Sequence, residues 1–309
     1  MYSGFGASSY HWRYNVPELA RQYHVYTIDL LGFGFSDKPI QDYDASVWKD
    51  QVVDFIQQII LNGEEESSKK VSIAGNSLGG YTAMYACSDK RIKENIAGCI
   101  LLNAAGRFKD QVASSEKDPS PNNHPIIILT LLLISRWLSS LSCGGFFLSL
   151  SEAVSAAIQR FVFVCFIYAK QPAQLKQVLR HVYPIDDSNV DTELVESIQT
   201  PALEDTAAEV FYRLFTANGR SGPQAYVDDI IKELDCPTLL CWGERDPCIK
   251  PTTANKMEEL HREFHGEGKN GNKWIKRVSI DAGHCPHDEA PGAVNKAILE
   301  FVEEALIGV

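Results

Sequence analysis

Apolar and polar positions follow two alternating patterns along most of the chain. Short runs rich in β-branched residues predict strands, and longer segments with apolar residues at helical spacing predict helices. The strand-like runs are 25–29, 71–74, 96–103, 236–243 and 274–281, and the helix-like segments between them include 47–61, 81–86, 251–264 and 292–306. This alternation predicts an α/β fold with a mostly parallel sheet covered by helices on both faces.

The alternation stops between residues 109 and 214. Five segments here look helical, and the first two are unusually apolar: 126–141, 152–169, 171–182, 191–198 and 205–215. We interpret 109–214 as a helical cap inserted between two strands of the sheet. Residues 1–108 and 215–309 then form the core that carries the sheet.

The first forty residues contain two glycine-rich loops. Residues 4–13 read as a glycine loop that enters a helix continuing to Ala20. The loop at 31–37 contains Gly32 and Gly34 but lacks the third glycine of a dinucleotide fingerprint, so a Rossmann cofactor site is rejected there.

Composition excludes several partners. The 309 residues carry a net charge of −11, which argues against binding nucleic acid or docking electrostatically on an anionic membrane. The most apolar run is too short to span a bilayer. Nothing in the pattern indicates an oligomeric state.

The eight cysteines show no metal-binding spacing. None forms a Cys-x-x-Cys pair, and several lie inside apolar runs. We expect buried, reduced thiols in a reducing compartment. The sequence analysis therefore predicts neither a metal nor a cofactor.

Ser77 lies in a Gly-x-Ser-x-Gly motif between a predicted strand and a predicted helix. Strand, tight turn and helix are the context of a nucleophile elbow. The turn is sharp, and side chains at Gly75 and Gly79 would collide with the neighbouring strand and helix. Ser77 is thus the candidate nucleophile. An ordinary serine in a glycine-rich turn is the alternative.

A serine nucleophile needs a base and an orienting acid, and both are expected at strand ends. Asp246 follows the 236–243 strand and His284 follows the last strand, which gives the chain order Ser, Asp, His. We predict Asp246 as the acid and His284 as the base. Glu244 is the alternative acid, and His287 is expected to brace its loop through a hydrogen bond.

Two backbone N–H groups are the candidate oxyanion hole. Leu78 begins the helix after Ser77, so its N–H can face the oxyanion while the helix N-terminus adds positive potential. The second donor is expected from the loop after the strand that precedes the first helix, which indicates the N–H of Phe5.

Three motifs resemble the α/β-hydrolase superfamily: 75–80 (GNSLGG), 242–247 (WGERDP) and 283–289 (GHCPHDE). This resemblance implies an α/β-hydrolase fold with an inserted helical cap and a cofactor-free serine hydrolase. Epoxide hydrolases and dehalogenases need an aspartate at the elbow, where this chain has Ser77.

A narrower resemblance is carried by residues 4–13 (GFGASSYHWR), 29–34 (DLLGFG) and 101–108 (LLNAAGRF). These segments are similar to the plastid pheophytinase and chlorophyll dephytylase group. The resemblance covers most of the chain and implies hydrolysis of a long isoprenoid ester on a tetrapyrrole. It also implies a plastid location, although no targeting peptide is recognised here.

The family has a hydrophobic strand ending in His-Gly where this chain has Met1, Tyr2, Ser3 and Gly4. By family analogy that strand is central and lies between the strands at 25–29 and 71–74. Removing it would leave unpaired backbone and an open core. We therefore expect an N-terminally truncated gene model or a fragment.

The apolar cap segments have two interpretations. Residues 126–133 and 161–167 either form a lid that admits a phytyl-like chain and touches a membrane surface, or pack on each other and on the core. The expected partner is a small apolar ester. The alternatives left open are a carbon–carbon bond hydrolase with the same three residues and a catalytically inert relative.

Overall fold

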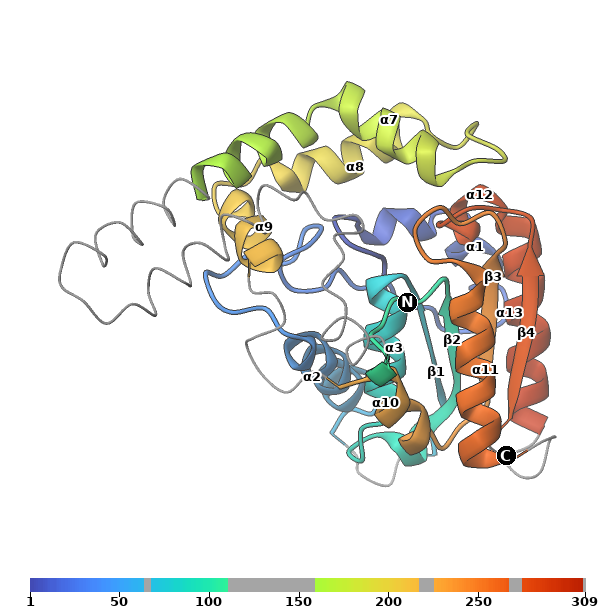
Figure 1. Cartoon of the computed structure of the whole chain (residues 1–309). Helices are drawn as coiled ribbons and strands as arrows, with labels where there is room; N and C mark the ends of the chain where they lie inside the picture. The colour runs from blue at the N-terminus through green and yellow to red at the C-terminus, as the bar shows by residue number, and fades with distance from the viewer. Residues whose placement is uncertain (64–67, 111–158, 217–224, 267–273, 308–309) are drawn as a thin grey trace.

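The computed structural model describes residues 1–63, 68–110, 159–216, 225–266 and 274–307 (Figure 1). The apolar helix expected at 126–141 and the first part of the one expected at 152–169 lie outside these residues.

A four-stranded parallel sheet forms the centre of the molecule. Its strands lie in the order β1 (Val71–Asn76), β2 (Ile96–Leu102), β3 (Thr238–Gly243) and β4 (Ile275–Ile280). Every residue of β2 and β3 is buried. Strands buried on both faces read as continuous apolar runs, which explains why the sequence pattern predicted β2 and β3; β1 and β4, which are less buried, were also predicted correctly.

The strand expected at 25–29 is not formed. Among the described residues, its only backbone-to-backbone bonds are with Met1: the Met1 ammonium donates to the Tyr26 carbonyl (2.7 Å) and the Ile28 amide donates to the Met1 carbonyl (3.3 Å). A strand needs a ladder of neighbours, and one residue cannot provide it. The prediction was wrong because the β-branched residues of 25–29 favour a strand, but they do not show whether a neighbouring strand is present to pair with it.

Tyr2 lies beside β1 on its outer side. Its amide donates to the Ala74 carbonyl and its carbonyl accepts from the Asn76 amide, each at 3.0 Å, so a single parallel bridge forms. Next to this bridge a cavity of about 440 Å³ opens between β1 and residues 23–26. The expectation that a strand belongs between these segments stays a prediction.

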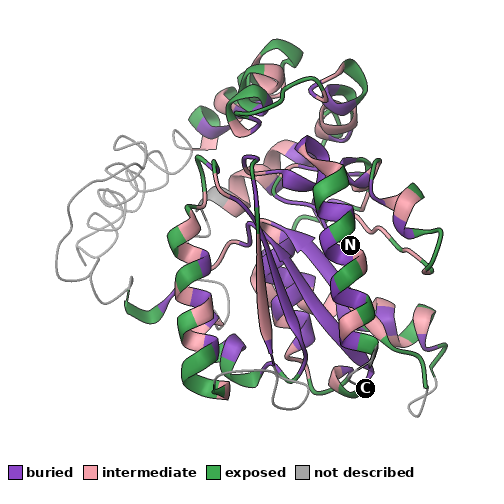
Figure 2. Ribbon diagram, turned by 90° about the vertical axis from the view of Figure 1, so that its right-hand side faces the viewer, coloured by how far each residue is buried: buried purple, intermediate pink, exposed green. Residues whose placement is uncertain are grey.

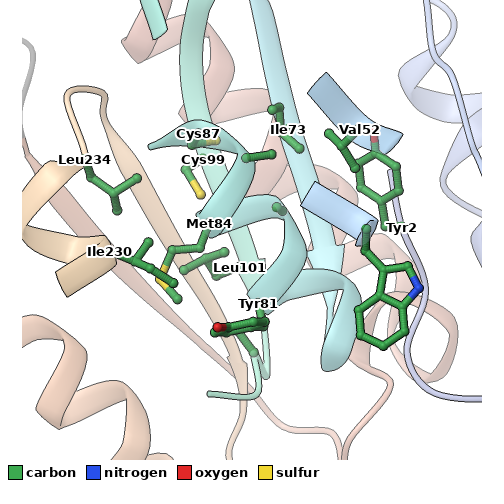
Figure 3. Packing of buried hydrophobic residues seen from close by; sticks show 14 of the residues in the cluster. Tyr2, Val52, Ile73, Tyr81, Met84, Cys87, Cys99, Leu101, Ile230 and Leu234 are labelled. Atoms are coloured by element: carbon green, nitrogen blue, oxygen red, sulfur yellow. The ribbon is translucent and has the colours of Figure 1, made fainter. Parts of the chain in front are cut away.

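Helices cover both faces of the sheet, as predicted (Figures 1 and 2). One face carries α2 (Ala45–Phe55), α3 (Leu78–Cys87), α10 (Val227–Glu233) and α11 (Pro251–His265), whose apolar side chains form the larger core cluster. Figure 3 shows Met84, Leu101 and Ile230 packed together within it. The other face carries α13 (Pro291–Ile307).

The N-terminal segment forms two short helices instead of the one continuous helix expected up to Ala20. These are η1 (Ser9–Trp12) and α1 (Val16–Leu19). Pro17 explains the break, because it has no N–H to donate and is favoured in the first turn of a new helix.

Helices also lie above the carboxyl ends of the strands (Figure 1). They are residues 159–169, α7 (Pro172–Val182), α8 (Thr192–Ala202) and α9 (Ala207–Thr216). These confirm the helical character predicted here, while the division into core and cap stays a prediction. Within the described ranges, no helix is both long and apolar enough to span a bilayer.

Candidate active site

Ser77 lies on a strained turn between β1 and α3. Its φ of 55° and ψ of −118° lie outside the regions that side chains favour. The two glycines around it are required by close approach. A Cβ at Gly75 would lie 2.1 Å from the Gly79 carbonyl oxygen, and one at Gly79 would lie 2.4 Å from that of Tyr2. The predicted collisions are therefore present, and the turn has the geometry of a nucleophile elbow.

Asp246 and His284 form a hydrogen-bonded pair. The Asp246 carboxylate is buried, and its Oδ2 lies 2.8 Å from Nδ1 of His284. Oδ2 also accepts from the Asn103 side-chain amide at 2.7 Å, and Oδ1 accepts from the Cys248 backbone amide at 2.6 Å. Three donors thus hold the carboxylate in one orientation, and it in turn orients the imidazole.

The His284 loop lies against the elbow. The side-chain amide of Asn76, the residue before Ser77, donates to the His284 carbonyl at 2.8 Å. The His284 amide donates to the Val182 carbonyl of α7 at 2.9 Å. In the part of the chain that the structure describes, no hydrogen bond joins the His284 ring to the Ser77 hydroxyl. The structure therefore brings the acid and base into contact, and it places the base's loop beside the serine.

The two candidate oxyanion donors flank Ser77. Leu78 is the first residue of α3, where backbone N–H groups have no partner within the helix. Gly4 packs on the serine, since a Cβ there would lie 3.0 Å from Ser77 Cβ and 3.5 Å from Oγ. Phe5, the second candidate donor, follows Gly4 directly in the chain, and its role in the oxyanion hole stays a prediction.

Glu244, the alternative acid, is hydrogen-bonded to residues other than His284. Its Oε1 accepts from the Ser279 hydroxyl at 2.6 Å and from the Arg277 guanidinium at 2.8 Å. Partial burial opposes ionisation of Glu244, but these two hydrogen bonds and the Arg277 charge outweigh it, and the net result is a lowered pKa. Of the two carboxylates, Asp246 is the one bonded to the histidine.

His287 differs from its expected role. Its ring is fully buried, and neither nitrogen has a hydrogen-bond partner among the described residues. The ring lies 4.3 Å from that of Trp12 and 5.9 Å from that of His11. Burial and the neighbouring His11 and His284 hold the pKa of His287 well below its usual value. The predicted bracing bond was wrong, and His287 positions its loop by packing.

A charged network ties this loop to the cap, and sequence reasoning missed it. Arg13 donates to both carboxylate oxygens of Asp191 (2.9 and 2.7 Å) and to Oδ1 of Asp288 (3.0 Å). Asp288 also accepts from the Tyr183 hydroxyl at 2.9 Å. Glu289 accepts from the Gly283 amide, one residue before the base.

A small apolar cavity of about 60 Å³ adjoins the Phe5 loop. It lies under α8 and α9, and Phe5, Phe166 and Phe211 contribute to its wall. The ring centroids of Phe5 and Phe211 are 6.0 Å apart, and those of Phe166 and Phe211 are 4.9 Å apart.

Comparison with protein families gives a match over nearly the whole chain. The model described as the alpha/beta hydrolase family matches residues 3–297. Pheophytinase, chloroplastic, of Arabidopsis thaliana is 27% identical over 97% of this chain, and the chain spans 60% of its length. Lipase 1 of Psychrobacter immobilis is 24% identical over 93% of this chain and 71% of its own length.

Solved structures share the fold. The meta-cleavage product hydrolase from Pseudomonas fluorescens superposes with a TM-score of 0.66 at 20% identity, covering 98% of this chain and 89% of that one. At this identity the likeness is one of architecture: a parallel sheet with helices on both faces.

Proposed function

The chain belongs to the alpha/beta hydrolase family, and from that premise we propose that it is a cofactor-free serine hydrolase of carboxylic esters. The observation that carries the proposal is the hydrogen bond of 2.8 Å between Asp246 and Nδ1 of His284, next to the strained turn of Ser77. This is the acid–base arrangement that activates a serine hydroxyl.

The reaction follows from these groups. Nδ1 of His284 keeps its proton toward Asp246, so Nε2 is free to accept the proton of the Ser77 hydroxyl as Oγ attacks the ester carbonyl. The N–H groups of Leu78 and Phe5 receive the oxyanion. His284 then gives the proton to the leaving alcohol, and a water molecule activated by the same ring hydrolyses the acyl-enzyme. Catalytic hydrogen bonds tighten when substrate binds, so the Ser77–His284 contact belongs to the substrate complex.

The proposed substrate is an ester with a long apolar alcohol, of the kind found in pheophytin or chlorophyll. The similarity to pheophytinase supports this, and so do the aromatic rings beside Phe5. With such a substrate the leaving alcohol carries the isoprenoid chain and the acyl-enzyme carries the tetrapyrrole. A plastid location is part of the same proposal.

The cap is the proposed contact with apolar surfaces. On the helix at 159–169, Val164, Ile167 and Tyr168 are 63%, 54% and 62% exposed. Apolar side chains in a row on a helix surface favour peripheral contact with a lipid surface, where the net charge of −11 gives no electrostatic help. Flotation with uncharged phosphatidylcholine vesicles tests this, and Val164→Asp with Ile167→Asp should abolish it.

The first experiment asks whether Ser77 is a nucleophile. A fluorophosphonate probe should label the wild-type chain and fail on Ser77→Ala, since it reacts with activated serines. The matched control is Ser88→Ala at the other end of α3, where the hydroxyl only caps a carbonyl. Ser88→Ala should label like wild type. Absence of labelling in all three proteins would support the inert alternative.

The second experiment asks which bond is cleaved. Pheophytin a, chlorophyll a and a short p-nitrophenyl ester are compared with a meta-cleavage diketone, and the products are identified. Carbon–carbon bond hydrolysis is the second candidate, because 82 residues of this chain are 42% identical to the 2-hydroxy-6-oxo-6-(2'-aminophenyl)hexa-2,4-dienoic acid hydrolase of Metapseudomonas resinovorans. Turnover of the diketone alone would replace the ester proposal. Equal rates on short and long esters would contradict selection for long chains.

A further inference from the structure

Three side chains with metal-binding atoms meet at the loop after β3. Asp246, Cys248 and His284 each offer one such atom, and these three atoms all lie within 4.8 Å of one another. In the described part of the chain, no other group of three meets this criterion. A carboxylate, a thiol and an imidazole together suit Zn²⁺ or Cd²⁺, whereas Mg²⁺ and Ca²⁺ prefer oxygen ligands alone.

The loop holds the three groups ready for a cation. The Cys248 amide donates to Asp246 Oδ1 at 2.6 Å, which fixes these two residues in one turn. His284 is held against the same carboxylate at 2.8 Å. Cys248 is exposed while Asp246 is buried, so a cation can enter from solvent at the thiol and reach the carboxylate.

We propose that Asp246, Cys248 and His284 bind one thiophilic divalent cation such as Zn²⁺, and that the bound cation switches the hydrolase off. The first part of this proposal, cation binding, depends only on the positions of the three side chains. The inhibitory half rests on the proposed function, because it needs His284 to act as the base.

The inhibition follows from where the ring proton goes. Without the cation, Nδ1 carries the proton between His284 and Asp246, and Nε2 is an acceptor. A cation bound at Nδ1 takes that position, so the neutral ring carries its proton on Nε2. Nε2 then donates and cannot accept the Ser77 proton. The thiol releases its proton to water on forming the thiolate bond, and no electrons are exchanged.

No sequence spacing reveals this site. Cys248 and Asp246 come from the loop after β3, and His284 comes from the loop after β4, 36 residues beyond the cysteine. Metal motifs are recognised by short intervals between ligands. Only the parallel register of β3 and β4 brings the two loops together.

The binding half is tested without any activity assay. The full chain is titrated with Cd²⁺, which gives a thiolate charge-transfer absorption, and with Zn²⁺ in equilibrium dialysis. We expect one equivalent bound, and Cys248→Ser should weaken binding by ~10–100-fold, the range that loss of even an outer partner brings. Cys165→Ser, a partly buried thiol of the cap, is the matched control and should bind like wild type. Equal affinity in wild type and Cys248→Ser would overturn the site.

The inhibitory half is tested on ester hydrolysis, each variant being compared with its own metal-free rate. Zn²⁺ should inhibit wild type and Cys165→Ser reversibly, with recovery on adding EDTA. Cys248→Ser should need ~10–100-fold more Zn²⁺. Identical inhibition of Cys248→Ser would reject the switch and leave the serine hydrolase standing. A chain inactive on every ester that still binds one Cd²⁺ through Cys248 would retain the site and reject the proposed function.

Discussion

Asp246 and Glu244 stand two residues apart on one loop, yet their partners give them different roles. Arg277 and Ser279 hold Glu244, and a histidine and an asparagine hold Asp246. Asn103 fixes the orientation of the Asp246 carboxylate. It follows β2 with a φ of 42°, and its side chain bonds both the Gly243 backbone and the Asp246 carboxylate. Location just after a strand thus indicates which carboxylates are candidates for the acid, and their hydrogen-bond partners show which of them contacts the histidine.

Asn103→Ala should lower kcat by ~100-fold with little change in KM. The substitution removes the bond of 2.7 Å to Asp246, and a misplacement of about 1 Å in a catalytic group costs roughly this factor. The matched control is Asn95→Ala, because Asn95 directly precedes β2 and Asn103 directly follows it. Steady-state kinetics should show a normal kcat for the control. Equal losses in both variants would point to general damage to β2.

Stability should fall as the pH drops below about 6.5. Burial, with Arg13 and His284 nearby, lowers the pKa of His11 to about 4, and burial holds the pKa of His287 well below its usual value. Between pH ~6.5, the ordinary pKa of histidine, and the lowered pKa in the folded chain, the unfolded chain binds a proton at each of these residues and the folded chain does not. Each such histidine therefore removes about 1.4 kcal/mol of unfolding free energy per pH unit, and its contribution is fully present above pH 6.5.

The variant that tests this is His11→Phe, which keeps a ring against His287 and removes both unpartnered nitrogens. Urea unfolding from pH 7.5 to 4.5 should show a shallower slope, reduced by about one proton, and the double change with His287→Phe should reduce it further. An unchanged slope in both variants would mean that other groups govern the acid limb.

At the scale of elements, one arginine connects three helices. Arg13 follows η1, Asp191 caps the N-terminus of α8, and Asp288 belongs to α12 (Pro286–Glu289). The Asp288 side chain is fully buried. Arg13 and Asp288 therefore form a desolvated ion pair in which each partner depends on the other, and the same guanidinium holds the start of α8 through the more exposed Asp191.

Arg13→Ala should destabilise the protein by ~3–5 kcal/mol, since it leaves the Asp288 carboxylate buried without its cation. Arg21→Ala is the matched control. Its side chain is 73% exposed and pairs with Glu18 three residues away, so the change should cost at most ~1 kcal/mol. Denaturant unfolding gives both values. Limited proteolysis should also show faster cleavage near residues 184–190 in Arg13→Ala only.

At the scale of the whole molecule, the sequence pattern was most informative where chemistry is local. Ser77 and its glycines form one continuous motif, and β2 and β3 read as strands because both of their faces are buried. The sequence pattern could not predict contacts between residues that lie far apart in the chain. The pairing of Asn103 with Asp246 joins positions 143 residues apart, and whether 25–29 forms a strand depends on a partner segment that its own residues do not reveal.

In the described part of the chain, Tyr2 alone pairs with the outer side of β1, so the rest of that side has no ladder bonds. Alternate residues of a strand direct their N–H groups to opposite sides. The amide of Asn76 bonds Tyr2 on the outer side, so those of Ser72 and Ala74 point the same way, toward the cavity of about 440 Å³. The amides of Ile73 and Gly75 face β2, which pairs with β1 along its length.

Hydrogen exchange should therefore alternate along β1. The amides of Ser72 and Ala74 should exchange at least ~10-fold faster than those of Ile73 and Gly75, because an amide without a ladder bond opens at little cost in free energy. Asn76 is the internal control: it points outward like Ser72 but bonds Tyr2, so it should be slow. Residue-resolved NMR exchange measures all five. Equal protection throughout would mean that a further strand covers this edge in solution.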